Sequence, residues 1–239
     1  MRGHTPFNND VSENGRYIYT GPDARKSAIS ANLSQSKLIA EGLAKIKATS
    51  VLDLGCGDGT FTREFYDLGI ATIIGFDPAE EAINFANNKF AIPGILSFTS
   101  SPISDITLSG EKFDCVVLRG VLHHCENPAD VLKQATFLGK YVIVLEPNGL
   151  NPIMKLIEKA SRYHREHSER SFSRFRINKW FQDSGFKPIQ VKVGILVPFF
   201  FPDILVAPLS KIEKVMKKIP IIRWVYCGTQ IFIAEPINS

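Results

Sequence analysis

The stretch Val51-Leu-Asp-Leu-Gly-Cys-Gly-Asp-Gly59 decides the fold of this chain. A short apolar run passes through an acid, Asp53, and is followed by glycine at every second position. A second apolar run, residues 73–76, ends in another acid, Asp77. The order of strand, glycine loop, helix and strand is typical of a nucleoside-binding β-α-β unit.

The charges around the glycines indicate which nucleoside binds. A dinucleotide site has the spacing G-x-G-x-x-G and binds a pyrophosphate, whereas here the spacing is G-x-G-x-G and two acids, Asp53 and Asp58, lie at the loop. These acids repel a pyrophosphate but attract a ligand that carries ammonium and sulfonium groups, such as S-adenosylmethionine. We expect Asp77 to accept hydrogen bonds from ribose hydroxyls. A purely structural glycine turn and a nicotinamide or flavin site are the alternatives.

Both segments resemble motifs I and II of the class I S-adenosylmethionine-dependent methyltransferases. The resemblance implies that S-adenosylmethionine is the cofactor and S-adenosylhomocysteine the product. It also implies an α/β fold with a doubly wound, mostly parallel seven-stranded sheet. The cofactor-binding residues expected in these motifs are Asp53, Gly55, Cys56, Gly57, Gly59, Asp77 and Pro78.

The pattern of apolar residues predicts the same alternation of strands and helices. Strands are expected at 50–54, 72–76, 95–99, 113–118 and 141–146, and helices at 25–47, 60–68, 78–90 and 128–138. The charged segment 152–176 is predicted to be helical. Two late strands, 186–193 and 229–234, are expected to pair antiparallel at the sheet edge, as in the methyltransferases.

Length and composition are consistent with a single domain over residues 1–239. We expect an N-terminal cap (1–47), a cofactor-binding core (48–150) and an acceptor-side lid, insertion and closing strands (151–239). The chain has 44% hydrophobic and 22% charged residues, a net charge of +4 and four cysteines without a C-x-x-C pair. These features predict a cytoplasmic protein with reduced thiols, without a secretory signal or a membrane-spanning helix.

The segment Arg119-Gly-Val-Leu-His-His124 follows the fourth strand, at the edge where ligands bind open α/β sheets. It resembles the corresponding segment of small-molecule methyltransferases similar to the ubiquinone-biosynthesis group. The resemblance implies that Leu118 and Arg119 lie along the cofactor and that His123 or His124 lies near the acceptor. A histidine there is a candidate general base toward a hydroxyl, and packing against the following helix is the alternative.

Other polar residues extend the predicted site. Ser101 follows the third strand and is expected to contact adenine, while Glu146 and Asn148 end the fifth strand and are expected to reach the acceptor. The sequence Pro-Asn-Gly also favours a simple turn at this position. Tyr163, His164 and His167 are expected to form an acceptor-binding lid, for which a solvated charged face and a metal site with Glu169 are alternatives.

The block 194–228 interrupts the closing strands. It contains an aromatic stretch at 197–202 and a lysine-rich amphipathic helix at 211–219. Peripheral membrane contact through 195–219, or admission of a lipid-linked acceptor, is one interpretation, and packing on the domain is the other.

We therefore expect methyl transfer to a small-molecule acceptor, at a hydroxyl oxygen, with glycan or lipid-linked precursors as candidates. The loop after strand four lacks Asn/Asp-Pro-Pro-Tyr/Phe, which argues against a nucleic-acid acceptor. No resident metal is predicted. The rival hypotheses are an NAD(P)-dependent oxidoreductase and an S-adenosylmethionine-binding protein without turnover.

Overall fold

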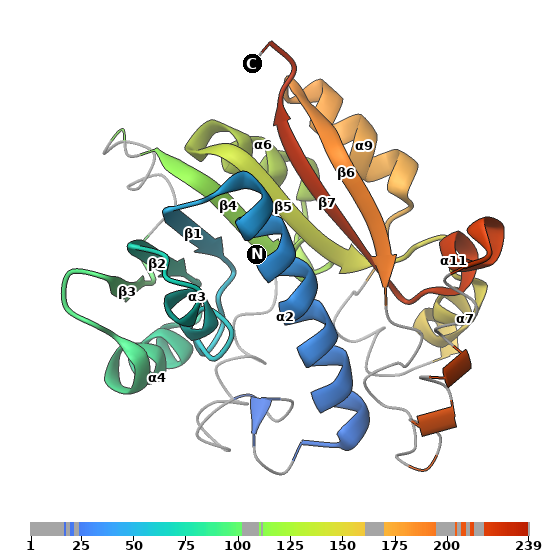
Figure 1. The fold of residues 1–239 in the computed structure, drawn as a ribbon, viewed down its shortest axis with the longest axis horizontal. Coiled ribbons are helices and arrows are strands. Elements are labelled where there is room, and N and C mark those ends of the chain that lie inside the picture. Colours follow the sequence, from blue (N-terminus) through green and yellow to red (C-terminus); the bar gives the residue numbers. More distant parts are fainter. Residues whose placement is uncertain are drawn as a thin grey trace.

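The computed structural model describes residues 17, 20–21, 24–101, 110, 112–160, 170–194, 204, 207–208, 211–212 and 218–238. Seven strands form one sheet in the order β3-β2-β1-β4-β5-β7-β6 (Figure 1). They are β1 (Ser50–Leu54), β2 (Thr72–Phe76), β3 (Leu96–Thr99), β4 (Phe113–Arg119), β5 (Gly139–Pro147), β6 (Phe186–Gly194) and β7 (Thr229–Pro236). All neighbours run parallel except β7, which is antiparallel to β5 and β6. The predicted doubly wound, mostly parallel seven-stranded sheet is confirmed.

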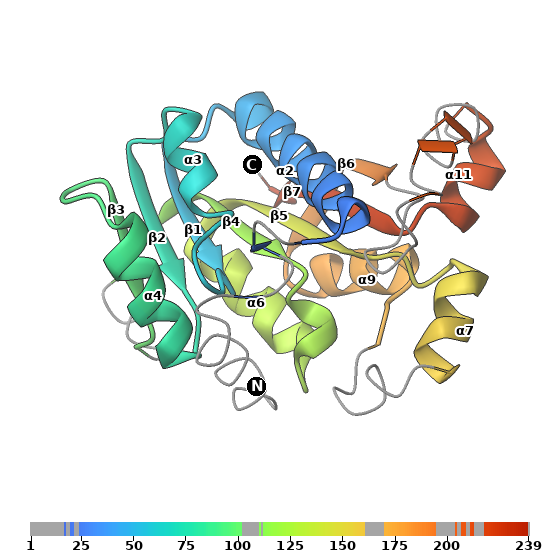
Figure 2. The same ribbon diagram turned by 90° about the horizontal axis from the view of Figure 1, so that it is seen from below.

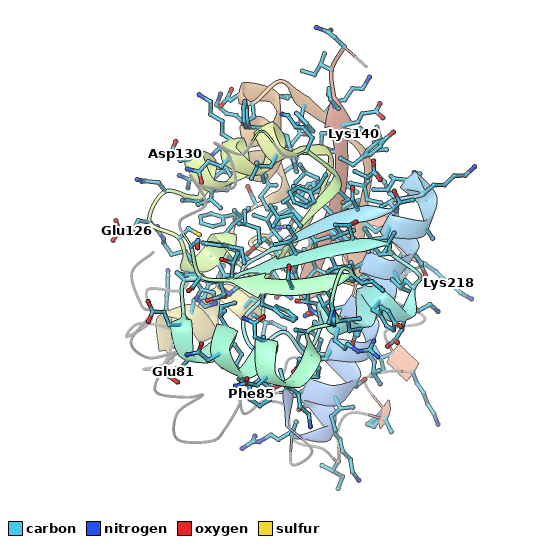
Figure 3. The ribbon with its side chains drawn as sticks, turned by 90° about the vertical axis from the view of Figure 1, so that its left-hand side faces the viewer. Glu81, Phe85, Glu126, Asp130, Lys140 and Lys218 are labelled. Atoms are coloured by element: carbon cyan, nitrogen blue, oxygen red, sulfur yellow. The ribbon has the colours of Figure 1, made fainter. Side chains whose placement is uncertain are left out.

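Helices cover both faces of the sheet (Figure 2). α2 (Lys26–Ile46), α3 (Arg63–Asp67) and α4 (Glu80–Phe90) pack on one face, and α6 (Pro128–Leu138) and α9 (Arg174–Asp183) pack on the other. In Figure 3, Phe85 marks α4 on one side of the sheet and Asp130 marks α6 on the opposite side. Successive residues of a strand point to opposite faces of the sheet and pack in different cores. Val51 packs with α2–α4, and Leu52 packs with α6 and α9. This double burial explains the continuous apolar sequence of the central strands.

Two helices begin later than the sequence predicts. The helix expected over 60–68 is shortened to α3, because Thr62 belongs to the glycine loop and donates its hydroxyl hydrogen to Asp53. The helix expected from residue 78 begins at Glu80, because Ala79 is extended and its N–H donates to the Asp77 side chain. In both places a carboxylate at the carboxyl end of a strand holds the residue that precedes the helix.

The prediction of a helical segment over 152–176 is partly wrong. α7 (Pro152–Ala160) lies within it, but Phe172 forms an isolated bridge with Asn148, and α9 begins only at Arg174. The N–H of Gly149 donates to the Phe172 carbonyl at 3.0 Å. Phe172 itself is buried in the α6–α9 core. Burial of this aromatic ring thus holds the chain in an extended form before α9.

The predicted insertion 194–228 contains α11 (Pro220–Tyr226), which contacts α7 (Figure 1). The aromatic stretch 197–202 and most of the lysine-rich helix lie outside the described residues, so membrane contact through 195–219 stays a prediction. Among the helices that the structure describes, none is long and apolar enough to cross a membrane.

Candidate active site

The glycine loop lies at the carboxyl edge of the sheet, directly after β1. The N–H groups of Gly55 and Cys56 both donate to the Phe76 carbonyl, at 2.7 and 2.9 Å, so the loop turns back over β2. Gly55 has φ of 88°, and a Cβ atom there would lie 2.5 Å from a methyl group of Val121. The left-handed backbone and the close approach both require glycine. The loop after β1 therefore packs directly against the loop after β4.

Asp53 offers a buried carboxylate oxygen to a ligand. Its side chain is 3% exposed, and its Oδ2 accepts the Thr62 hydroxyl hydrogen at 2.6 Å. Its Oδ1 has no hydrogen-bond partner among the described residues. Burial raises the pKa of Asp53 to about 6, although the Thr62 hydrogen bond and the Arg119 charge oppose the shift. A buried acceptor that lacks a donor fits the ammonium group of S-adenosylmethionine.

Asp77 ends β2 in the position expected for a ribose partner. Its Oδ2 accepts the N–H of Gly57 and its Oδ1 accepts the N–H of Ala79, both at 2.9 Å. These two contacts orient the carboxylate at the end of β2. Pro78 follows, half-buried, at the start of the turn into α4.

The other predicted cofactor residues differ in what they present at this edge. Ser101 is exposed, and its N–H donates to the Thr99 hydroxyl at 3.1 Å. The Leu118 side chain is fully buried in the α6–α9 core, so only its backbone faces the edge. Burial raises the pKa of the Cys56 thiol well above its ordinary range, which keeps it neutral.

Arg119 fastens α2 to the end of β4. Its guanidinium donates to the side chains of Gln35 (3.2 Å) and Ser36 (3.0 Å) and to the Asn32 carbonyl (3.1 Å). The same group lies 3.6 Å from the centre of the Phe61 ring. The sequence predicted Arg119 beside the cofactor but gave no sign of these contacts, since they join residues more than 80 positions apart.

His123 and Glu146 interact beside the loop after β4, which packs against Gly55. The predicted fourth-strand loop contains a short 3-10 helix, η2 (Leu122–His124). His123 Nδ1 lies 2.8 Å from Glu146 Oε2, while Glu146 Oε1 accepts the N–H groups of Val121 and Leu122 at 2.8 and 2.7 Å. The His124 ring is tilted against the His123 ring with 3.9 Å between centroids. Glu146 is fully buried.

Asn148 has a structural environment. It is 1% exposed, its amide donates to the carbonyls of Trp224 and Cys227, and its oxygen accepts the N–H of Leu150. The turn interpretation therefore describes this residue well, and direct acceptor contact by Asn148 stays an untested prediction. Tyr163, His164 and His167 lie outside the described residues. Within the described ranges, no group of three His, Cys, Asp or Glu side chains is arranged to hold a metal ion.

Asp58 has a different role from the one that its charge suggested. Its carboxylate is 2% exposed and accepts hydrogen bonds from Tyr17 N, the Thr20 hydroxyl and Thr60 N. It thus binds the N-terminal segment, and the charge argument for a cationic ligand rests on Asp53 alone. The contacts of Thr20 with Asp58 and of Thr62 with Asp53 were missed by sequence reasoning, because each contact depends on the folded chain.

Comparison with known proteins agrees with this geometry. The methyltransferase domain family model matches residues 24–191. The ubiquinone biosynthesis O-methyltransferase of Methylobacterium nodulans is 30% identical over 106 residues, which cover 44% of this chain and 40% of that protein. A tRNA U34 carboxymethyltransferase of Campylobacter hominis is 28% identical over 90 residues, 37% of this chain and 32% of that protein. The matches thus span less than half of these curated relatives.

Solved structures share the whole fold. The magnesium protoporphyrin IX methyltransferase of Synechocystis PCC 6803, solved with bound SAH, aligns with a TM-score of 0.69 and 15% identity, over 98% of this chain and 97% of that chain. At this identity the likeness concerns the fold, whereas the family model covers most of the sequence. The chain therefore belongs to the methyltransferase domain family and has the fold of the class I S-adenosylmethionine-dependent methyltransferases.

Proposed function

We propose that this methyltransferase moves the methyl group of S-adenosylmethionine to a hydroxyl oxygen of a small-molecule acceptor, with His123 as the general base. The pair formed by buried Glu146 and half-buried His123 supports the proposal most directly, since His123 lies on the loop that packs against Gly55. A neutral hydroxyl must lose its proton as the new O–CH₃ bond forms, and an oriented imidazole meets that need.

The cofactor side of the proposal rests on the fit of three groups. Asp53 would bind the ammonium group, Asp77 the ribose hydroxyls, and Ser101 the adenine. The sulfonium supplies an activated methyl group, so the protein must mainly align the acceptor oxygen with the methyl carbon and sulfur. The glycine at position 55, with its positive φ and its close packing on Val121, supports an approach of the cofactor to the loop backbone, because no Cβ atom is in the way.

Glu146 determines which ring nitrogen of His123 carries the proton. A carboxylate oxygen only accepts, so the proton of the neutral imidazole is placed on Nδ1, and the basic lone pair is on Nε2. When the imidazole gains a second proton, the adjacent carboxylate stabilises the imidazolium. We infer that Glu146 is a positioning residue, in place of the substrate-binding role expected from the sequence. His124 stays a second candidate for the base.

The named relatives act on different acceptors, so their names do not identify the acceptor of this chain. One matched relative is a ubiquinone O-methyltransferase and another modifies tRNA. We favour the small-molecule hydroxyl because a positioned base serves this chemistry directly. The absence of a nucleic-acid partner, the glycan or lipid-linked class and the cytoplasmic location remain predictions. An oxidoreductase is disfavoured by the family assignment.

A transfer assay tests the proposal. The protein is incubated with S-adenosylmethionine labelled in its methyl group and with separate panels of phenols and alcohols, amines, and tRNA. We expect label in hydroxyl compounds, matched by S-adenosylhomocysteine formation and lost in His123→Ala. Label only in amines or tRNA, or full activity in His123→Ala, refutes it. Asp114→Asn, at the opposite edge of the sheet, is the control for general effects of substitution.

A further inference from the structure

Two arginines lie around one tryptophan ring near the carboxyl end of β5. Arg174 is the first residue of α9, and Arg223 lies in the middle of α11. The guanidinium carbon of Arg174 is 4.2 Å from the centre of the Trp224 ring, and that of Arg223 is 5.8 Å from the same ring. In Figure 1, α11 lies with α7 beyond the carboxyl end of β5. Two positive charges are therefore gathered at this edge of the sheet.

These two arginines lack a group to neutralise them. The Nε atoms of Arg174 and Arg223 are buried and have no hydrogen-bond partner, and no carboxylate in the described part of the chain forms an ion pair with either residue. Arg63 makes a useful contrast, because it also lies over a ring, that of Tyr66, but pairs with Asp67 at 2.7 Å. Folded proteins pair nearly all buried donors, so two buried guanidinium N–H groups without acceptors indicate a site for an anion.

The backbone beside both arginines is attached to the end of β5. The Asn148 amide donates to the Trp224 carbonyl at 2.9 Å, which holds α11. The N–H of Gly149 donates to the Phe172 carbonyl at 3.0 Å, two residues before α9 begins. The arginines are thus carried by two segments that are fixed to the same strand end, so the pair is held in place before a ligand arrives.

The proposed base is built on the same residues of β5. Glu146, which lies 2.8 Å from the imidazole of His123, precedes Asn148 by two positions. The end of this strand therefore supports the general base on one side, through the loop after β4, and the arginine pair on the other, through α11 and the start of α9.

We propose that Arg174 and Arg223 bind an anionic group, a carboxylate or a phosphate, of the methyl acceptor. Guanidinium groups bind the oxygens of both anions through paired N–H donors, and such a group supplies the acceptor that the two Nε atoms lack. Trp224 holds the guanidiniums by cation–π contact. An anion held here fixes one end of the acceptor and so limits the orientations of the group that receives the methyl. The inference rests on the proposed function and adds the charge of its substrate.

Binding of small anions tests the arginine pair without turnover. The probes are benzoate, phenyl phosphate and the neutral benzyl alcohol, titrated by calorimetry at low salt into the full chain with S-adenosylhomocysteine present. We expect an anionic probe to bind and benzyl alcohol not to bind. The affinity for the anion should fall about tenfold or more in Arg174→Gln and in Arg223→Gln, since each loses a charge-assisted hydrogen bond.

Two further variants separate anion binding from general damage. Arg63→Gln removes an arginine that already has a carboxylate partner, so it should leave the affinity for the anion unchanged. Arg174→Lys keeps the charge and should lose less affinity than Arg174→Gln, and thermal unfolding is measured for each protein. Equal affinity in all the variants, equal loss in Arg63→Gln, or binding to phosphatidylglycerol vesicles without binding to either soluble anion overturns the proposal.

A kinetic comparison distinguishes failure of this inference from failure of the proposed function. The measured quantity is kcat/KM for methyl transfer to a hydroxybenzoate and to the corresponding neutral hydroxybenzyl alcohol. We expect a preference of about tenfold or more for the carboxylate, lost in Arg223→Gln. Equal kcat/KM for the two compounds overturns the anionic acceptor and leaves the proposed function intact. Arginine-dependent anion binding together with transfer only to amines overturns the hydroxyl acceptor and supports the anion site.

Discussion

Replacement of Glu146 by glutamine tests whether His123 is the general base, because it changes the one atom that contacts the imidazole. The glutamine carbonyl can still accept the N–H groups of Val121 and Leu122, which now bind Glu146 Oε1. The atom 2.8 Å from His123 Nδ1 changes from an acceptor oxygen to an NH₂ donor. The imidazole must then accept at Nδ1, which moves its proton to Nε2 and removes the basic lone pair from that atom.

The expected loss follows from the role of the lone pair. General-base catalysis contributes about 10²- to 10⁴-fold, so kcat should fall by about 100-fold or more, which corresponds to at least about 3 kcal/mol in the barrier. S-adenosylhomocysteine affinity should stay within about twofold, because no proposed cofactor contact involves Glu146. Both quantities come from steady-state kinetics with a hydroxyl acceptor and from isothermal titration calorimetry.

A double-variant cycle separates positioning from structural damage. If Glu146 acts through His123, the loss in kcat in His123→Ala should not deepen when Glu146→Gln is added, since the two residues work as one unit. Glutamine with kcat within about threefold of the unaltered enzyme, or losses that multiply in the double variant, would refute the reasoning.

Three further predictions concern the rest of the site. Asp53→Asn should stabilise the ligand-free protein at pH 8 by up to about 3 kcal/mol in thermal unfolding. Because the pKa of Asp53 is raised to about 6 in the folded protein, the protonated carboxyl stabilises the fold below pH 4, and this contribution is lost as the pH rises through 6. Gly55→Ala should destabilise the fold more than Gly69→Ala in chemical denaturation. Both residues have positive φ, but an added Cβ atom would lie within 4 Å of another side chain at Gly55 and of no atom at Gly69. Arg119→Lys should increase amide exchange in the first half of α2, because an ammonium cannot reproduce the spread of guanidinium donors.

The sequence predicts the elements that depend on local pattern. The glycine spacing and the two acids place β1 and β2 correctly, and Pro128 marks the first turn of α6 as expected. The helix expected from residue 60 fails because the Thr62 hydroxyl binds a carboxylate nine residues earlier. Local propensity does not include this contact, because it depends on the folded position of β1.

Contacts between distant residues explain the remaining differences. Arg119 pairs with Leu145 in the β4–β5 register, which brings Glu146 to the backbone of the loop that follows β4. Nothing in the residue types specifies this register in advance, so the sequence does not predict the contacts of Glu146 with Val121, Leu122 and His123. The attachment of Tyr17 to Asp58 spans 41 positions and is equally invisible in the local pattern.

The number of donors around each buried acid distinguishes their roles. Among the residues that the structure describes, Asp58 and Glu146 each have three hydrogen-bond partners, whereas Asp53 has one, the Thr62 hydroxyl. A buried carboxylate with few donors is costly to ionise, which accounts for its pKa of about 6. An ammonium group at Oδ1 supplies the missing donor and favours the ionised form.

Cofactor binding should therefore be linked to the loss of a proton from Asp53. Below pH 6 the free protein holds this proton, so S-adenosylhomocysteine affinity should fall as the pH decreases from 7 to 5, by up to about tenfold per pH unit. Calorimetry at pH 5.5 in two buffers of different ionisation enthalpy measures the proton released. In Asp53→Asn the release should disappear. Release that persists in this variant contradicts the assignment of Asp53 as the ammonium partner, because the proton would then come from another group.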